Sequence, residues 1–188
     1  MAYCTKEEVK REINIKDTDW DEVFDSLCGE ASGFIDGFCG RTFSHASETR
    51  YFDPDDPEVL FIDDFITLES LKVDQDGDGE FEKAWEKDKD YLLYPLNKLP
   101  RTWIEAIGQG FPTGRKRVRI TASWGYSSTP PPAIKRACIM LVSRWFKRKD
   151  TAFASVVSTS ELGTFEVYRG MDADIELLLS PFRRINIG

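Results

Sequence analysis

Three aspartates at alternate positions are the residues of this chain whose types and spacing most suggest chemistry. Asp74, Asp76 and Asp78 lie in the segment DQDGDG, which resembles the start of an EF-hand calcium loop. A complete loop needs a bidentate glutamate at its twelfth position, which is Trp85 here, with Glu86 one residue late. Because Asp-Gly steps also supply the positive φ angles of a hairpin, we predict a turn, with adventitious cation binding as the alternative.

A second acidic group occurs in a segment broken by two prolines. Its members are Asp53, Asp55, Asp56, Glu58, Asp63 and Asp64. Clustered carboxylates can hold the two metal ions of a nuclease. No histidine or lysine lies close by in the sequence to complete such a site, so we expect a solvated or electrostatically repulsive loop surface.

A basic cluster follows a Pro-Thr-Gly turn and consists of Arg115, Lys116, Arg117 and Arg119. Contact with DNA phosphates is one interpretation of such a cluster. The interpretation that we favour is a charged loop that meets the acidic surface of a neighbouring subunit. Arg115 and Arg117 are therefore candidate residues of a subunit interface.

The four cysteines, Cys4, Cys28, Cys39 and Cys138, form no C-x-x-C pair, and His45 is the one histidine. We predict reduced, buried thiols rather than a zinc site. The sequence also lacks a Gly-rich phosphate loop, a G-x-S-x-G motif and a Cys/His pair. We therefore expect no catalytic residues, no metal beyond the weak aspartate candidate, no cofactor and no enzymatic activity.

The composition is that of one domain with a core of its own. The chain has 188 residues, of which 41% are hydrophobic, and a net charge of −8. An acidic protein is a poor candidate for tight nucleic-acid binding, since that affinity comes mainly from neutralised phosphates. The charged N-terminus lacks the apolar stretch of a signal peptide, and no run approaches the ~18 apolar residues of a membrane span. We expect a soluble, intracellular protein.

Helical periodicity dominates the first forty residues. Thr5 and Glu8 form a capping box that begins a short helix ending near residue 13. A second helix, with Asp17 or Thr18 as its N-cap, continues to the helix-terminating Gly40.

Three glycines, Gly29, Gly33 and Gly37, leave one side of the second helix bare. This spacing is compatible with two interpretations. Another helix approaches this side closely, or the helix simply tolerates the three glycines without a packing role.

A strong amphipathic helix is predicted at 131–150, after three consecutive prolines. Ile139, Met140 and Phe146 lie off its main apolar stripe, which indicates burial on more than one side. This second side of the helix could be buried equally well by another subunit or by the chain's own β region. These three residues are therefore candidate interface residues.

The predicted fold class is α+β, with a helical bundle core and an inserted antiparallel β region of hairpins or a meander. One domain spans 1–188. Its helical core comprises 5–40 and 131–180 and includes a short final helix that Asp172 caps. The short strands and proline-rich turns of 49–126 form the insertion. The segment 181–188 is predicted to be a flexible C-terminal tail.

The order of these motifs resembles the head–tail connector proteins, or head-completion adaptors, of long-tailed bacteriophages. The resemblance depends on the order of the pieces over nearly the whole chain, since no single piece is specific. The pieces are GFIDGFCGRTF, DQDGDGEF, DYLLYPLN, RVRITASWGY, the run WGYSSTPPPAIKRACIMLVSRWFKRKD, ELGTF, MDADIELLL and SPFRR.

This resemblance implies a structural protein of the virion neck, assembled in the host bacterial cytoplasm. Copies would form a ring, expected to be a dodecamer, under the portal protein. The ring would extend the DNA channel, pass the genome without sequence-specific binding, and dock the next stopper or tail protein. Phe182 and Ile185 would anchor the tail on the portal, and Arg183 and Arg184 would supply charge. The alternatives are another neck or tail ring protein (a stopper or tail terminator) and, less favoured, a calcium-dependent binding module.

Overall fold

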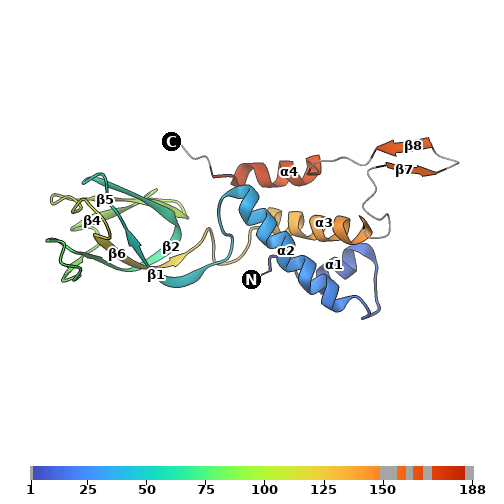
Figure 1. The fold of residues 1–188 in the computed structure, drawn as a ribbon, viewed down its shortest axis with the longest axis horizontal. Coiled ribbons are helices and arrows are strands. Elements are labelled where there is room, and N and C mark those ends of the chain that lie inside the picture. The colour runs from blue at the N-terminus through green and yellow to red at the C-terminus, as the bar shows by residue number, and fades with distance from the viewer. Residues whose placement is uncertain (1, 149–155, 160–162, 167–170, 185–188) are drawn as a thin grey trace. The chain divides into compact units, whose positions relative to one another are not determined.

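The computed structural model describes residues 2–148, 156–159, 163–166 and 171–184. The chain divides into two compact units. We call Met1–Gly40 with Pro130–Gly188 the helical unit, and Arg41–Thr129 the sheet unit (Figure 1). Among the described residues, no helix has the length and apolar character needed to span a membrane.

The helical unit contains α1 (Lys6–Ile13), α2 (Asp21–Cys39), α3 (Pro132–Arg148) and α4 (Ala173–Leu179), followed by a 3₁₀ turn, Ser180–Phe182. Strands β7 (Val156–Thr159) and β8 (Gly163–Glu166) pair as a separate two-stranded antiparallel sheet.

The helix ends agree largely with their sequence signals. The Thr5–Glu8 capping box is confirmed, with the Thr5 N–H donating to the Glu8 carboxylate at 3.1 Å. Gly40 ends α2 in the left-handed region at φ 64°, and Asp172 caps α4. The start of α2 differs from the prediction: Trp20 occupies the N-cap and makes no side-chain cap hydrogen bond.

Aromatic packing joins α2 to α3. Phe146 lies 4.5 Å from Phe24 and 5.7 Å from Trp20, measured between ring centroids. The burial of Phe24 and Phe146 removes apolar surface from water, at about 25 cal/mol per Å². A separate ion pair joins Arg144 of α3 to Asp172, the N-cap of α4, at 3.2 Å.

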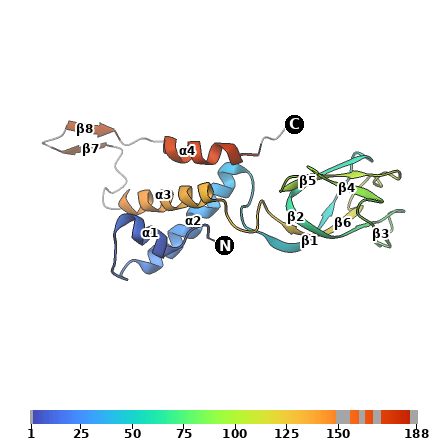
Figure 2. The same cartoon turned by 180° about the vertical axis from the view of Figure 1, so that it is seen from behind.

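The sheet unit is built on a six-stranded antiparallel sheet with the order β1–β6–β2–β5–β4, and β3 pairs with β2. β3, which is labelled in Figure 2, pairs with Leu71–Val73 at the end of β2. The strands are β1 (Ala46–Phe52), β2 (Val59–Val73), β3 (Lys83–Trp85), β4 (Tyr91–Tyr94), β5 (Arg101–Ala106) and β6 (Val118–Trp124).

Alternation of side chains builds the core of this sheet. Along β6, Val118, Ile120, Ala122 and Trp124 are buried, and the residues between them are partly exposed. They belong to a cluster of thirteen buried residues, all of which lie in the sheet unit. The cluster is Leu60, Ile62, Phe65, Leu71, Val73, Trp85, Tyr91, Ile104, Phe111, Val118, Ile120, Ala122 and Trp124.

The prediction of a helical bundle core with an inserted β region is wrong. The fold is a sheet-rich α+β fold, in which the six-stranded antiparallel sheet has a hydrophobic core of its own and the helices form no core bundle. Nor is the sheet a simple meander, since β1 pairs with β6 and β6 pairs with β2. The physical reason is that a sheet with this much buried apolar surface needs no helical scaffold.

The region predicted to contain only short strands holds one long strand, β2, which is continuous over Val59–Val73. Asp63 and Asp64, which we predicted to lie in a loop, are inside it. Asp64 is 4% exposed, and its carboxylate lies 3.5 Å from the Arg41 guanidinium, which compensates its charge. The strand changes register between Phe61 and Phe65, and this shift permits the acidic pair within it.

The glycine side of α2 faces open space within the described part of the chain. A Cβ atom built at Gly29, Gly33 or Gly37 has no neighbouring atom within 4 Å outside its own helix backbone. No described helix therefore approaches this side, and the three glycines are tolerated rather than required for packing within the chain.

We expect Gly33→Ala to raise the free energy of unfolding by about 0.5–1 kcal/mol, because alanine lowers the conformational entropy of the unfolded chain and meets no neighbour in the folded one. Gly40→Ala is the control, and it should destabilise by about 1 kcal/mol because of the left-handed φ of Gly40. Urea unfolding of both variants measures the effect. Destabilisation by Gly33→Ala would contradict this expectation, because it would show that other atoms pack against the side of α2 that carries Gly33.

Candidate interaction surfaces

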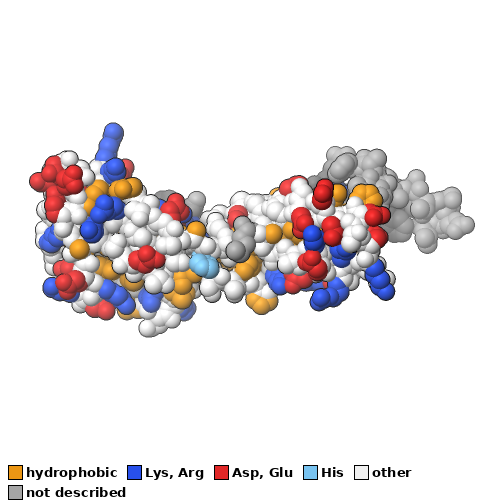
Figure 3. Space-filling view, turned by 90° about the horizontal axis from the view of Figure 1, so that it is seen from below, with side chains coloured by type: hydrophobic (Ala, Val, Ile, Leu, Met, Phe, Trp, Pro, Cys, Tyr) orange, Lys and Arg blue, Asp and Glu red, His pale blue; other side chains and the backbone are white. Residues whose placement is uncertain are grey.

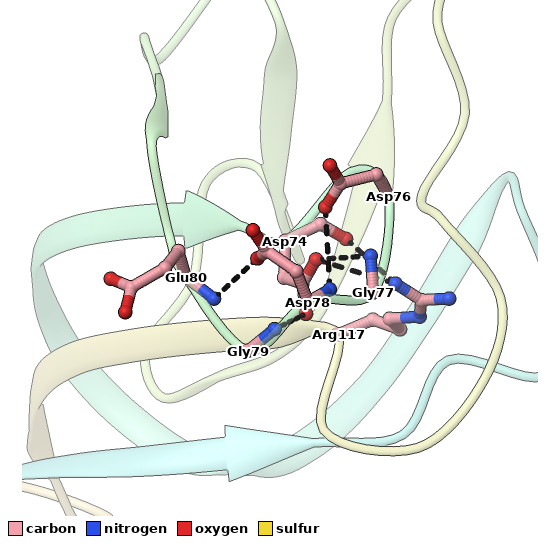
Figure 4. Close-up of polar contacts among 7 residues, drawn as sticks. All are labelled: Asp74, Asp76, Gly77, Asp78, Gly79, Glu80 and Arg117. Carbon is pink, nitrogen blue, oxygen red and sulfur yellow. Dashed lines mark hydrogen bonds and ion pairs between the residues drawn. The ribbon is translucent and has the colours of Figure 1, made fainter.

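The aspartate segment forms a tightly hydrogen-bonded turn after β2 (Figure 4). The Asp74 carboxylate accepts the N–H groups of Gly77 at 2.6 Å and Gly79 at 3.0 Å. Asp76 and Asp78 each accept the N–H of the residue two positions later, at 3.3 Å and 2.8 Å. Such local bonds are typical of Asx turns, and this supports the predicted turn.

A guanidinium group supplies the positive charge of this turn. Arg117 Nη1 lies 3.3 Å from the Asp74 carboxylate, which is buried at 3% exposure for the whole residue. A Cβ at position 77 would collide with this guanidinium, and φ there is 91°, so glycine is required on both counts. Asp74, Asp76 and Asp78 do lie within 4.8 Å of one another. Both carboxylate oxygens of Asp74, and one oxygen each of Asp76 and Asp78, accept backbone N–H groups within the turn.

The hydrogen bonds of the turn control the titration of Asp74. Burial by itself would raise the pKa of the Asp74 carboxyl. The N–H donors of Gly77 and Gly79, together with the Arg117 guanidinium, outweigh it and hold that pKa below its ordinary value. The turn is therefore built around an ionised Asp74.

Most side chains of the basic cluster make contacts within the sheet unit itself. Arg117 binds Asp74, Lys116 lies over the ring of Tyr51 at 4.5 Å, and Arg119 lies over Phe81 at 4.8 Å. Arg115 is exposed. Of the two predicted interface arginines, Arg115 is therefore available to a neighbour and Arg117 stabilises its own chain.

The three interface candidates of α3 also have different surroundings. Phe146 is buried against α2, whereas Ile139 and Met140 are half-buried. Met140 lines a groove of about 650 Å³ within the helical unit. The groove is lined by Glu12, Ile13, Arg136, Met140, Ser143, Arg144, Lys147, Arg148, Asp172 and Ile175.

The first residues of the predicted tail bind α2 of the same chain. The Arg184 N–H donates to the carbonyl of Cys39 at 2.8 Å, and the Arg183 guanidinium lies 5.0 Å from the Phe38 ring centroid. Phe182 ends the 3₁₀ turn and is half-buried, and Ile185 lies outside the described residues. Two of the portal-docking candidates, Arg183 and Arg184, therefore lie beside the C-terminal end of α2.

An exposed aromatic row on the sheet escaped the sequence analysis. Phe61, Trp103 and Tyr94 are successive cross-strand partners on β2, β5 and β4. Phe61 is 74% exposed, and the Tyr94 and Trp103 rings stack at 5.5 Å with 7° between their planes. Alternation alone could have predicted the row, since Phe61 lies between the buried Leu60 and Ile62.

Charges of both signs are interspersed on the face shown in Figure 3, where acidic and basic side chains lie next to one another. Among the described residues on this face there is no extended basic stripe of the kind that marks a nucleic-acid interface.

Comparison with known proteins identifies the fold. No protein-family model and no curated protein matches the chain. A chain from the structure "Neck of empty GTA particle computed with C6 symmetry" matches with a TM-score of 0.63 and 15% identity, over 96% of this chain and 89% of that one. The chain has the fold of a protein from the neck of gene transfer agent (GTA) particles.

Two further structures of the same kind agree. A chain from the "Neck of native GTA particle computed with C12 symmetry" matches with a TM-score of 0.61 and 17% identity, over 96% of this chain and 88% of that one. A chain from the virion of the native gene transfer agent particle matches with a TM-score of 0.58 and 17% identity, over 89% and 79%. The likeness to these neck chains includes both units, since it covers nearly the whole chain.

We expect Asp74→Asn to lower Tm at neutral pH, because the amide loses the charge that faces Arg117 and an acceptor for a backbone N–H. A carboxyl whose folded pKa is depressed stabilises the fold above its unfolded pKa of about 3.9, and this stabilisation is lost as the pH falls through the folded value. The Tm difference between wild type and variant should therefore shrink in acid.

Thermal unfolding from neutral pH down into the acid range measures this difference. Asp55→Asn, at an exposed position, is the matched control. A Tm difference that stays constant with pH would contradict the role of the ionised Asp74.

Proposed function

We propose that this protein is a subunit of a head–tail connector, or adaptor, in the neck of a phage or phage-like particle. Its ring would sit on the portal vertex, extend the DNA channel and offer a docking surface for the next head-completion or tail protein. The observation that carries the proposal is the likeness of the fold, over 96% of this chain, to chains from particle necks. The order of the connector-like motifs along the sequence supports it independently.

A ring of twelve subunits agrees with the C12 symmetry stated for one similar neck. In a closed ring, each subunit presents two unlike surfaces, one to each neighbour. The aromatic row around Phe61 is a suitable surface on the sheet unit, because Phe61 is exposed beside the half-buried Trp103, whose ring stacks on that of Tyr94. Ile139, Met140 and Arg115 remain candidates elsewhere.

The role is structural rather than enzymatic. The likeness of the fold to chains from particle necks supports this role. A net charge of −8 suits a ring that lets DNA slide past without sequence-specific contact. The partners would be the portal protein, further copies of this chain and a stopper or tail protein. Assembly would take place in the host bacterial cytoplasm.

We expect a ring mass by light scattering, either for the protein alone or when portal particles are added. Arg183→Glu should weaken retention on the portal, because it reverses an exposed charge beside the end of α2. Lys98→Glu, at an exposed position of the sheet unit, is the control. A monomer that ignores the portal and binds only tail-tube protein would contradict the connector and favour a stopper or tail terminator.

Phe61→Ser should reduce self-association at least tenfold and leave Tm within about 2 °C, since a side chain that is 74% exposed contributes little to folding. Leu177→Ser, on α4 at 73% exposure, is the matched control for loss of an exposed apolar side chain. Sedimentation equilibrium of both variants measures the association. An unchanged association constant for Phe61→Ser would exclude the aromatic row as the interface.

A further inference from the structure

Three of the four thiols converge inside the helical unit. The Sγ of Cys4 lies 3.0 Å from that of Cys138 and 3.5 Å from that of Cys28. All three cysteines are buried. They come from the segment before α1, from α2 and from α3, so only the folded chain brings them together. Cys39 is separate from the group, and its Sγ lies 3.9 Å from the Leu179 carbonyl.

The segment that carries Cys4 is held in place by its neighbour, Tyr3. The Tyr3 N–H donates to Ser32 Oγ at 2.9 Å, and the Tyr3 hydroxyl donates to the Asp36 carboxylate at 2.5 Å. Ser32 Oγ in turn lies 3.7 Å from Cys138 Sγ. These bonds position Cys4 between α2 and α3, in contact with Cys138.

We propose that Cys4 and Cys138 form an intramolecular disulfide when the folded protein meets an oxidising disulfide such as glutathione disulfide. A disulfide bond measures about 2.05 Å, so the two sulfurs need to approach by only about 1 Å. Cys4 also touches Cys28, but that pair starts farther apart.

The exchange proceeds in two balanced steps. When the N-terminal segment opens, the Cys4 thiolate attacks glutathione disulfide and forms a mixed disulfide, releasing one glutathione thiolate. After the segment closes, the Cys138 thiolate attacks Cys4 Sγ and releases the second. Two protein thiols are oxidised, one glutathione disulfide is reduced to two glutathione molecules, and the two thiol protons pass to them.

Geometry favours the second step. In the reduced fold, the side-chain contact with Cys4, with help from Ser32 and against the effect of burial, lowers the pKa of the Cys138 thiol. Once Cys4 is joined to glutathione its thiol proton is gone, whereas the contact of Cys138 Sγ with Ser32 Oγ at 3.7 Å does not depend on it. A thiolate is the attacking species in exchange, and Cys138 already lies in contact with the sulfur that it would attack.

A neck protein would meet different redox conditions during assembly and after release of the particle. This consequence of the disulfide rests on the proposed function. Assembly in a reducing cytoplasm would keep the thiols free, and release of the particle would expose them to oxidising surroundings. The bond links residues 134 positions apart in sequence. Closing so long a loop constrains the unfolded chain, so Tm of the helical unit should rise by about 5–10 °C.

The test is made on the isolated, folded chain. The protein is incubated with glutathione disulfide, alkylated with N-ethylmaleimide, digested without reduction and mapped by mass spectrometry. We expect a Cys4–Cys138 peptide, loss of two of the four free thiols, and a higher Tm that dithiothreitol reverses. Cys39→Ser is the matched control and should form the same bond, whereas Cys4→Ser should not.

Two results would overturn the proposal. One is that all four thiols stay free in the folded wild type under conditions that oxidise the denatured chain. The other is that Cys4–Cys28 is the main product. The wild-type map decides between these outcomes even where a variant folds poorly. Because the isolated chain is used, failure of the disulfide leaves the portal experiment unaffected, and failure to bind the portal leaves the disulfide result standing.

Discussion

Backbone pairing along β2 is the constraint on which the sheet unit depends. This strand of 15 residues pairs with β5 through its first part and with β6 and β3 through its last part. Its burial pattern changes face near Phe65, where Asp64 and Phe65 are both buried. The register shifts at this point let one strand serve two sets of partners. Every core residue of the sheet is positioned relative to it.

The same strand positions the two surface features of the sheet unit. Its first part places Phe61 outward beside Trp103, while Leu60 and Ile62 point into the core. Its end leads into the Asp74 turn, where the Asp74 N–H donates to the Arg117 carbonyl at 2.9 Å. The aromatic row and the charged turn are therefore both positioned by the same strand.

The helical unit is organised differently. Its core consists of side chains from separate helices, such as Phe24, Phe146 and Ile175. Ion pairs such as Lys135–Glu8 and Arg136–Glu12 link α1 to α3 at 2.5 Å and 2.8 Å. Each such exposed pair contributes less than about 1 kcal/mol. Apolar packing therefore holds the unit together, and the thiols of Cys4, Cys28 and Cys138 are buried within it.

The sequence by itself determined the features that depend on neighbouring residues. The Thr5–Glu8 box, the Gly40 terminus, the alternation of β6 and the Asp-Gly turn all follow from residues a few positions apart, since hydrogen bonds and φ preferences act over one turn. Tertiary structure decided the rest. β2 is continuous through Asp63 and Asp64 because β5 pairs with its first part, up to Phe65, and β6 pairs with it from Phe65 onward, and the sulfur contact of Cys4 with Cys138 spans 134 positions. No local pattern encodes such pairings, because they depend on which distant surfaces bury each other.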